Sequence, residues 1–482
     1  MLTILLLLLP LAFSLILFFI KDKLLAQKIA LLVSIIELII GISANAVYNR
    51  AIPLNHIFEE NWIPSMGIHF AFAMDGLSIL LVLLTVVLVP FILLSTYNRK
   101  EPLPSAFFAL VLLMQAALVG VFTTTDAFMF YIFWELALIP IYFICAIWGG
   151  ENKLKITLKF FIYTMLGSLF MLASLIYLYI LTSLPHSFSI HALTTVILTP
   201  AQQTWVFAGF FLAFAIKMPV FPFHSWQPDT YTVAPSAGSM LLAGIMLKMG
   251  LYGMLRFLIP SAPGIIGCVA PYAIALALTG LIYGSVIAVK QKEIKRLIAY
   301  SSFAHVGLMA AAIFSLTIDG LQGSIYQMLS HGINVFALFF IADIIQNRCQ
   351  TSTISELGGI AKSAPRFAVF FMIVMLGSVA LPLTNGFVGE FLMLLGLAKY
   401  ALWVAAVAGL SVILGAVYMF RLYQHTMYGE NNSLTSAFED LNRLEMTIAV
   451  PISLIILVMG IFPKPLLDIS LPFVHQVLSI IH

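Results

Sequence analysis

TWVFAGFFLAFAIKMPVFPF (residues 204–223) and APSAGSMLLAGIMLKMGLYGMLRF (residues 234–257) are long apolar stretches that each carry a lysine, Lys217 and Lys248. Two glutamates have similar surroundings: Glu135 in FMFYIFWELALIPIYF (128–143) and Glu390 in LPLTNGFVGEFLMLLGLA (381–398). Ionisable groups at the centre of a bilayer are costly, and they usually face a water-filled interior that moves ions or protons. Snorkelling to the interface suits Arg256, near a predicted helix end. It does not suit Lys248, which lies roughly 15–20 Å from either end of its helix at about 1.5 Å per residue.

Composition defines the broad class. Hydrophobic residues make up 62% of the 482-residue chain and charged residues only 9%, and the mean hydropathy is +1.07. A soluble fold could not bury so much apolar surface, so the sequence predicts an all-α polytopic membrane protein. Its three cysteines offer neither a disulfide framework nor metal-ligand spacing, and no nucleic-acid partner is indicated.

Hydropathy predicts about fourteen membrane spans. Their expected limits are 2–20, 27–48, 75–97, 104–123, 127–148, 157–181, 204–226, 235–258, 268–290, 296–316, 321–346, 366–398, 401–427 and 445–463, followed by a short interfacial tail over 466–481. We interpret the first span as a retained helix and not as a cleaved signal, because no basic segment precedes it.

The distribution of basic residues predicts the orientation. Connections after odd-numbered spans hold most of the 23 lysines and arginines, among them Arg99, Lys100, Lys153 and Lys290. The opposite side has only Arg50, Arg256, Lys399 and Lys464. By the positive-inside rule, we expect the first group to be cytoplasmic and both termini to lie outside.

Two of the predicted helices are interrupted. Pro219 and Pro222 follow Lys217 in the seventh span, and Pro382 precedes Glu390 in the twelfth. Proline breaks or kinks a helix, and broken helices at matching positions point to an ion site in repeat-built transporters. Each break falls in the fourth helix of a five-helix unit. Because five membrane crossings are an odd number, the second unit would start on the opposite side of the membrane and be inverted relative to the first. The expected segments are 1–103 (three helices), 104–258 and 268–427 (the repeats), and 428–482 (the last helix and tail).

Further polar residues extend the line of buried charges. His305 lies in RLIAYSSFAHVGLMAAAIF and His331 in GSIYQMLSHGINVFALFFIADII. Histidine titrates near neutral pH and can pass protons, although either residue alone could equally be a packing residue. Lys295 is interpreted as a lysine set by topology, and His224 as a structural or entry-side residue. Glu37 could contact another subunit or be a protonated carboxyl, and the sequence does not decide between these.

The chemistry predicted by this pattern is the movement of protons between ionisable groups, without covalent catalysis. A carboxylate beside an ammonium keeps both ionised, and separating them favours the neutral forms. A Glu135–Lys217 pair could therefore act as a switch that sends a proton towards Lys248, then through the histidines and internal water to Glu390. The sequence contains no phosphate-binding loop, nucleophile elbow or redox-centre ligand set.

At these residues the chain resembles a known family. AIKMPVFPFHSWQPDTYTVAPSAGSMLLAGIMLKMGLYGMLRF, KRLIAYSSFAHVG, SHGINVFALFF and NGFVGEF are similar to the proton-pumping membrane subunits of respiratory complex I, which are related to Mrp-type sodium/proton antiporters. The resemblance covers essentially the whole chain and implies a fourteen-helix antiporter-like subunit with a central hydrophilic axis. The family's functional positions fall on Glu135, Lys217, Lys248, His305, His331 and Glu390.

Glu390 makes this chain resemble the M-type chains of the family. The L, N and Mrp D-type chains typically carry lysine at the corresponding position of the broken twelfth helix. The resemblance implies a subunit of a proton-translocating NADH:quinone oxidoreductase in a bacterial inner membrane, with both termini periplasmic. The partners that it implies are L and N chains, smaller membrane chains and lipid. It also implies that protons move through internal water along the hydrophilic axis. This chain would hold no metal, cofactor or redox site, and flavin and iron–sulfur centres are expected in partner subunits. The alternatives are a subunit of an Mrp-type antiporter or of a membrane-bound hydrogenase.

Overall fold

The computed structural model describes residues 2–98 and 103–481 of the chain. Arg99 and Lys100, two of the basic residues used to predict the orientation, lie outside the described residues. The chain divides into two compact units. The first consists of Met1–Pro219, Ile245–Tyr272 and Asp468–His482, and the second of Val220–Gly244 and Ala273–Leu467.

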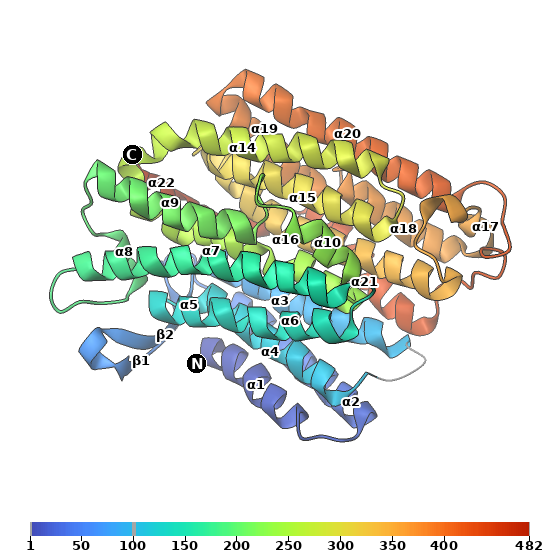
Figure 1. Ribbon diagram of the computed structural model, residues 1–482, viewed down its shortest axis with the longest axis horizontal. Coiled ribbons are helices and arrows are strands. Elements are labelled where there is room, and N and C mark those ends of the chain that lie inside the picture. Colours follow the sequence, from blue (N-terminus) through green and yellow to red (C-terminus); the bar gives the residue numbers. More distant parts are fainter. Residues whose placement is uncertain (1, 99–102, 482) are drawn as a thin grey trace. The chain divides into compact units, whose positions relative to one another are not determined.

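The first unit begins with apolar helices and one hairpin. Its elements up to the first buried lysine are α1 (Leu2–Leu17), α2 (Lys23–Ala46), β1 (Asn55–Ile63), β2 (Ile68–Met74), α3 (Gly76–Ser95), α4 (Ser105–Thr123), α5 (Ala127–Leu136), α6 (Leu138–Trp148), α7 (Lys153–Leu181), α8 (Ile190–Thr194) and α9 (Pro200–Lys217). Helices α7 and α9 run side by side (Figure 1).

The first unit also includes the helix that carries Lys248. This helix consists of α12 (Lys248–Gly253), a π-helical turn over Met254–Leu258 and α13 (Ile259–Ser261). The unit further takes in most of α22 (Lys464–Ile481), whose buried residues recur with helical spacing. The expected tail over 466–481 is thus an amphipathic helix.

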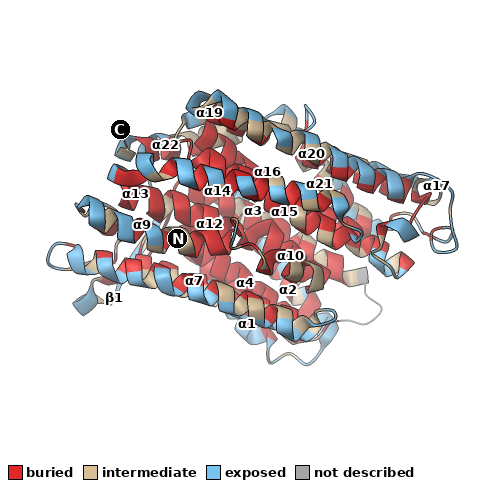
Figure 2. Ribbon diagram, turned by 45° about the horizontal axis from the view of Figure 1, so that its top comes forward, coloured by how far each residue is buried: buried red, intermediate tan, exposed pale blue. Residues whose placement is uncertain are grey.

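The second unit carries the histidines and Glu390. It contains α10 (Trp226–Val233), α11 (Ser236–Leu241), most of α14 (Pro263–Lys290), α15 (Ile294–Ile313), α16 (Ile318–Cys349), α17 (Ile360–Ser363), α18 (Pro365–Ser378), α19 (Asn385–Tyr400), α20 (Leu402–Met427) and α21 (Arg443–Ile461). Helix α16 is buried along almost all of its length, whereas α7 of the first unit and α20 alternate between buried and exposed faces (Figure 2).

The chain is mostly helical, as predicted, but the all-α prediction is wrong in one region. Strands β1 and β2 pair as an antiparallel hairpin in a stretch where the sequence predicted only a connection. Gly67 forms the turn with φ +60, and a Cβ there would lie 2.1 Å from the His186 carbonyl oxygen, so glycine is required. Backbone hydrogen bonds from Thr125 N to the Ala71 carbonyl and from Phe188 N to the Gly67 carbonyl hold the hairpin against the start of α5 and the segment before α8.

Candidate membrane spans account for most of the helices. Within the described residues, 11 helices are long and apolar enough to cross a membrane, and Leu2–Leu17 and Pro365–Ser378 are shorter apolar helices. Side-chain caps mark the starts of three of these helices. The carboxylates of Asp22, Asp75 and Asp126 each accept hydrogen bonds from the first free backbone N–H groups of α2, α3 and α5, respectively.

Both predicted interruptions are present. Helix α9 ends at Lys217 and α10 starts only at Trp226, while α18 ends at Ser378 and α19 starts at Asn385. The missing N–H groups of the prolines in both gaps explain why neither helix continues.

Candidate functional site

Lys217 lies at the last position of α9. A capping box of Thr199 and Gln202 starts this helix, with Pro200 at its first position. The lysine is 2% exposed. Its Nζ makes no hydrogen bond within the described residues and lies 5.2 Å from the centroid of the Trp134 ring. The ammonium group is therefore held over an aromatic face.

Glu135 lies near the end of α5, next to Trp134. The helix of this span is interrupted at Ala137, and Pro140 cannot donate a backbone hydrogen bond to the turn that contains Glu135. Glu135 Oε1 is buried without a hydrogen-bond partner in the described part of the chain. Trp134, the residue directly before Glu135, carries the ring that Lys217 Nζ lies over. Neither Lys217 Nζ nor Glu135 Oε1 makes a hydrogen bond among the described residues.

Lys248 is fully buried at the start of α12. A π-helical turn over Leu242–Met246 precedes it and another follows at Met254. Such turns inside α-helices often occur at functional sites. A Cβ at Gly250 would lie 3.0 Å from both the Phe214 carbonyl oxygen and the Met218 nitrogen, so the glycine lets this helix approach the end of α9 closely.

His305 and Glu390 make the central contact of the second unit. His305 Nε2 on α15 lies 3.2 Å from Glu390 Oε1 on α19, and both side chains are largely buried. His305 Nδ1 lies 2.8 Å from the Ser301 carbonyl oxygen. A carbonyl only accepts hydrogen bonds, so we assign a proton to Nδ1. The proton between Nε2 and Oε1 can then reside on either atom.

His331 on α16 joins this pair, with its ring centroid 5.7 Å from that of His305. The two histidines line a cavity of about 20 Å³, which is room for about one water molecule. Its other polar lining residues are Ser301, Ser302, Gln327, Asn334 and Ser378. The two histidines predicted on these segments therefore face a small cavity that is lined by polar side chains.

Helix α16 packs tightly on α19 around Glu390. Ser330 Oγ donates to the Asn385 carbonyl at 3.0 Å, and Asn334 Nδ2 donates to Asn385 Oδ1 at 3.0 Å. A Cβ at Gly389 would lie 2.3 Å from Gln327 Oε1. These contacts fix the first turn of the helix that presents Glu390.

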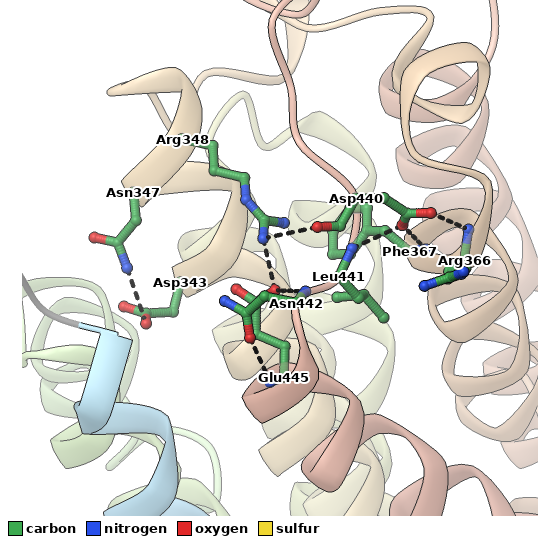
Figure 3. Close-up of polar contacts among 9 residues, drawn as sticks. All are labelled: Asp343, Asn347, Arg348, Arg366, Phe367, Asp440, Leu441, Asn442 and Glu445. Atoms are coloured by element: carbon green, nitrogen blue, oxygen red, sulfur yellow. Dashed lines mark hydrogen bonds and ion pairs between the residues drawn. The ribbon is translucent and has the colours of Figure 1, made fainter.

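A polar cluster fixes the opposite end of α16 (Figure 3). Arg348 Nη2 lies 2.6 Å from Glu445 Oε2, and the Asp440 carboxylate accepts hydrogen bonds from the backbone N–H groups of Arg366 and Phe367. The cluster links α16, the start of α18 and the start of α21, so three helices around the His305–Glu390 pair share one anchor.

Sequence reasoning missed or misread several residues of the site. Arg256 does not snorkel, because it forms a buried ion pair with Asp75 at 2.6 Å. Lys295, interpreted as a lysine set by topology, is buried at the start of α15. Tyr418, whose hydroxyl accepts a hydrogen bond from Ser301 Oγ at 3.1 Å, gave no signal in the sequence. His224 stacks on Phe303 with centroids 4.6 Å apart, a packing contact that favours the structural one of the two roles predicted for it.

The six candidate residues thus fall into two groups. Glu135, Lys217 and Lys248 lie in the first unit, and His305, His331 and Glu390 in the second. A multi-spanning helical protein with lysines, histidines and carboxylates inside its membrane segments belongs to the class of ion- or proton-translocating membrane proteins.

Comparison with known proteins defines the family. The family model described as "NADH:quinone oxidoreductase/Mrp antiporter, TM" matches residues 124–415. NADH-quinone oxidoreductase subunit M of Rickettsia typhi is 40% identical over 93% of this chain and 91% of its own length. Subunit M of Rhodobacter capsulatus is 36% identical over 95% and 91%. A chain of respiratory complex I from Thermus thermophilus, solved with bound NADH, matches with a TM-score of 0.93 at 32% identity over 100% of both chains.

The chain belongs to the NADH:quinone oxidoreductase/Mrp antiporter transmembrane family. The resemblance inferred from its motifs, including the M-type assignment from Glu390, is confirmed by the subunit M relatives.

Proposed function

We propose that this chain is the antiporter-like, proton-translocating M-type subunit in the membrane arm of an NADH:quinone oxidoreductase. Quinone reduction elsewhere in the complex would drive it, and electron transfer would take place in other subunits. The names of its relatives and its likeness to a complex I chain support this assignment.

The observation that carries the proposal is the His305–Glu390 contact beside a cavity large enough for one water. With Nδ1 bound to the Ser301 carbonyl, the contact has two forms: an imidazolium with a carboxylate, or an imidazole with a carboxylic acid. Both keep a hydrogen bond between Nε2 and Oε1, so neither leaves a buried group unpaired. A proton can therefore move between the two residues at a small energetic cost.

The buried lysines of the first unit provide the other part of the proposed proton path. Lys217 Nζ lies over the Trp134 ring, and Lys248 is fully buried in an apolar helix. Weakening the influence of Glu135 would favour release of the proton from Lys217. We propose that the two units act in series, from Glu135 and Lys217 to Lys248, then through His305 and His331 to Glu390.

The proposal includes an architecture and a location. We propose about fourteen spans, since two apolar helices shorter than a typical span accompany the longer ones. Residues 104–258 and 268–427 would be inverted five-helix repeats, between the segments 1–103 and 428–482. The breaks after Lys217 and Ser378, at matching positions, support this division. The protein would lie in a bacterial inner membrane with both termini periplasmic, which the basic connections support.

The proposed partners are the L- and N-type chains, smaller membrane chains and lipid. Flavin and iron–sulfur centres would be held by partner subunits, and this chain would contribute no cofactor, metal or redox site. The exposed apolar faces of helices such as α7 and α20 support contact with lipid or other membrane chains.

The test is proton translocation by the intact complex in sealed vesicles energised with NADH. His305→Ala should lose most vesicle acidification while NADH oxidation by an artificial acceptor is retained, because removal of the imidazole leaves Glu390 without its proton partner. His475, an exposed histidine on α22, provides the matched control, and His475→Ala should pump like the wild type. Sodium uptake in place of acidification in the wild type would favour the antiporter alternative, and equal pumping in both variants would contradict the proposal.

A further inference from the structure

Arg256 is a buried cation that the proposed proton path does not use. It follows Lys248 on the same helix, and its guanidinium lies 2.6 Å from Asp75 Oδ2, with the two side chains only 16% and 5% exposed. Its Nη2 donates to Ser78 Oγ at 3.2 Å, and its Nε donates to the Tyr252 hydroxyl at 3.2 Å. Arg256 therefore closes a polar line that starts at Lys248.

Tyr252 is the intermediate member of that line. It stands four residues after Lys248 and four before Arg256, the spacing that places side chains on one face of a helix. Its hydroxyl donates to the Phe122 carbonyl at 3.3 Å and accepts from Arg256 Nε. A hydroxyl relays a proton only if it can pass its own hydrogen to a base. Here its neighbours are a backbone carbonyl and a cation, so the relay stops.

Two aromatic rings and a helix cap hold the guanidinium in place. Its carbon lies 5.1 Å from the Tyr252 ring centroid and 5.0 Å from that of Phe473 on α22. Asp75, its counter-ion, caps α3 with Oδ1, which accepts from Leu77 N and Ser78 N. A guanidinium stays protonated in proteins, so this charge is permanent and fixed.

We propose that Arg256 is an electrostatic barrier that prevents protons on Lys248 from escaping along its own helix to the outer side of the membrane. The proposal rests on the proposed function. A fixed arginine excludes protons and cations from membrane pores by the same physics. With this exit closed, a proton that reaches Lys248 must leave through the second unit, so that translocation remains coupled to electron transfer.

The experiment compares variants of the intact complex reconstituted in liposomes. Arg256→Gln removes the charge, and the double variant Asp75→Asn with Arg256→Gln removes both charges without leaving an unpaired buried carboxylate. Arg256→Lys retains the charge. The matched control is Arg50→Gln, since Arg50 and Asp468 form an Arg–Asp ion pair in the same unit that is 48% and 36% exposed.

Two quantities are measured: the decay of an imposed pH gradient without NADH, and the stimulation of NADH oxidation by an uncoupler. We expect both neutral variants to leak protons about tenfold faster than the wild type, equivalent to about 1.4 kcal/mol of barrier, and to lose stimulation by the uncoupler while electron transfer continues. Arg256→Lys and Arg50→Gln should leak protons no faster than the wild type.

The outcomes separate this inference from the proposed function. A wild-type complex that does not acidify its vesicles would defeat the proposed function, whatever Arg256 does. If the wild-type complex pumps but the double variant neither leaks protons nor loses uncoupler stimulation, the barrier role of Arg256 is overturned and the proposed function stands. A proton leak in Arg256→Lys would overturn the barrier role in the same way. If both neutral variants fail to assemble, the ion pair belongs to folding and the proposal is overturned.

Discussion

The Nζ atom of Lys217 lies 5.2 Å from the centroid of the Trp134 ring and makes no hydrogen bond within the described residues. Trp134 directly precedes Glu135, whose Oε1 is likewise buried without a partner among those residues. The ring thus supports a buried ammonium that is not tied to a carboxylate. A lysine held in this way can respond to small changes at Glu135, because no hydrogen bond must first be broken.

The first prediction concerns the aromatic support of Lys217. A desolvated cation–π contact is worth about 2 kcal/mol, so Trp134→Leu should slow NADH-driven proton translocation about thirtyfold, whereas Trp134→Phe should retain an intermediate rate. The measurement is the initial rate of vesicle acidification. Trp205→Leu, on the same helix as Lys217 but 77% exposed, is the control and should be silent. An unchanged rate in Trp134→Leu would show that the ring only fills space.

The second prediction compares a buried lysine with an exposed one. Lys248 is fully buried, while the side chain of Lys399 is 57% exposed and pairs with Asp319. Lys248→Ala should abolish pumping with a modest effect on assembly, because the buried amine that would carry the proton is lost. Lys399→Ala should pump normally, since an exposed ion pair contributes about 0–1 kcal/mol. Normal pumping in Lys248→Ala would remove this lysine from the path.

The third prediction concerns the start of α5, the helix that carries Glu135. Asp126 Oδ1 accepts from Phe128 N and Met129 N, and Oδ2 accepts from His69 N. Asp126→Ala should destabilise this region by about 1–2 kcal/mol, as for other helix caps. Hydrogen exchange at the first turn of α5 measures the loss. Asp126→Asn keeps the cap and should exchange more slowly than the alanine variant.

Ionisation of Asp126 adds a pH dependence to this comparison. Burial raises the pKa of the Asp126 carboxyl above its ordinary value, against the opposing effect of the three backbone hydrogen bonds. The stability that this carboxyl contributes is therefore complete below its unfolded pKa of about 3.9 and is lost as pH rises through the folded value. Relative to Asp126→Asn, the wild type should lose protection as pH rises through that interval, and a constant difference would contradict the assignment.

Much of the fold could be predicted from the sequence, because apolar runs and prolines act locally. The breaks after Lys217 and before Asn385 appear where the prolines place them. The β1–β2 hairpin was missed for a physical reason: its strands span 9 and 7 residues, and hydropathy windows of about 19 residues average over such short amphipathic elements. The π-helical turns around Lys248 leave no compositional signal.

Partners across helices could not be predicted in the same way. The sequence singled out His305 and Glu390 as buried polar residues, but only the packing of α15 on α19 places them 3.2 Å apart. Arg256 and Asp75 lie far apart in the chain, and Arg256 is near a helix end where snorkelling is the usual expectation. Their ion pair depends on where the fold places the start of α3 relative to Arg256, which one sequence does not reveal.

The last prediction concerns Glu390, the proposed end of the proton path. Glu390→Gln should reduce pumping strongly, because an amide cannot release a proton and His305 loses its carboxylate partner. Glu390→Asp should retain some activity, since it keeps the acid at a slightly shorter reach. Glu390→Lys should be tolerated better than the glutamine variant, because lysine can also exchange a proton, although it would face His305 with a like charge and coupling would weaken. Proton uptake in reconstituted vesicles, normalised to electron transfer, ranks the three variants. Glu439→Gln, a change in the connection after α20, serves as the control and should match the wild type. Full pumping in the Glu390→Gln variant would show that protons leave by another route.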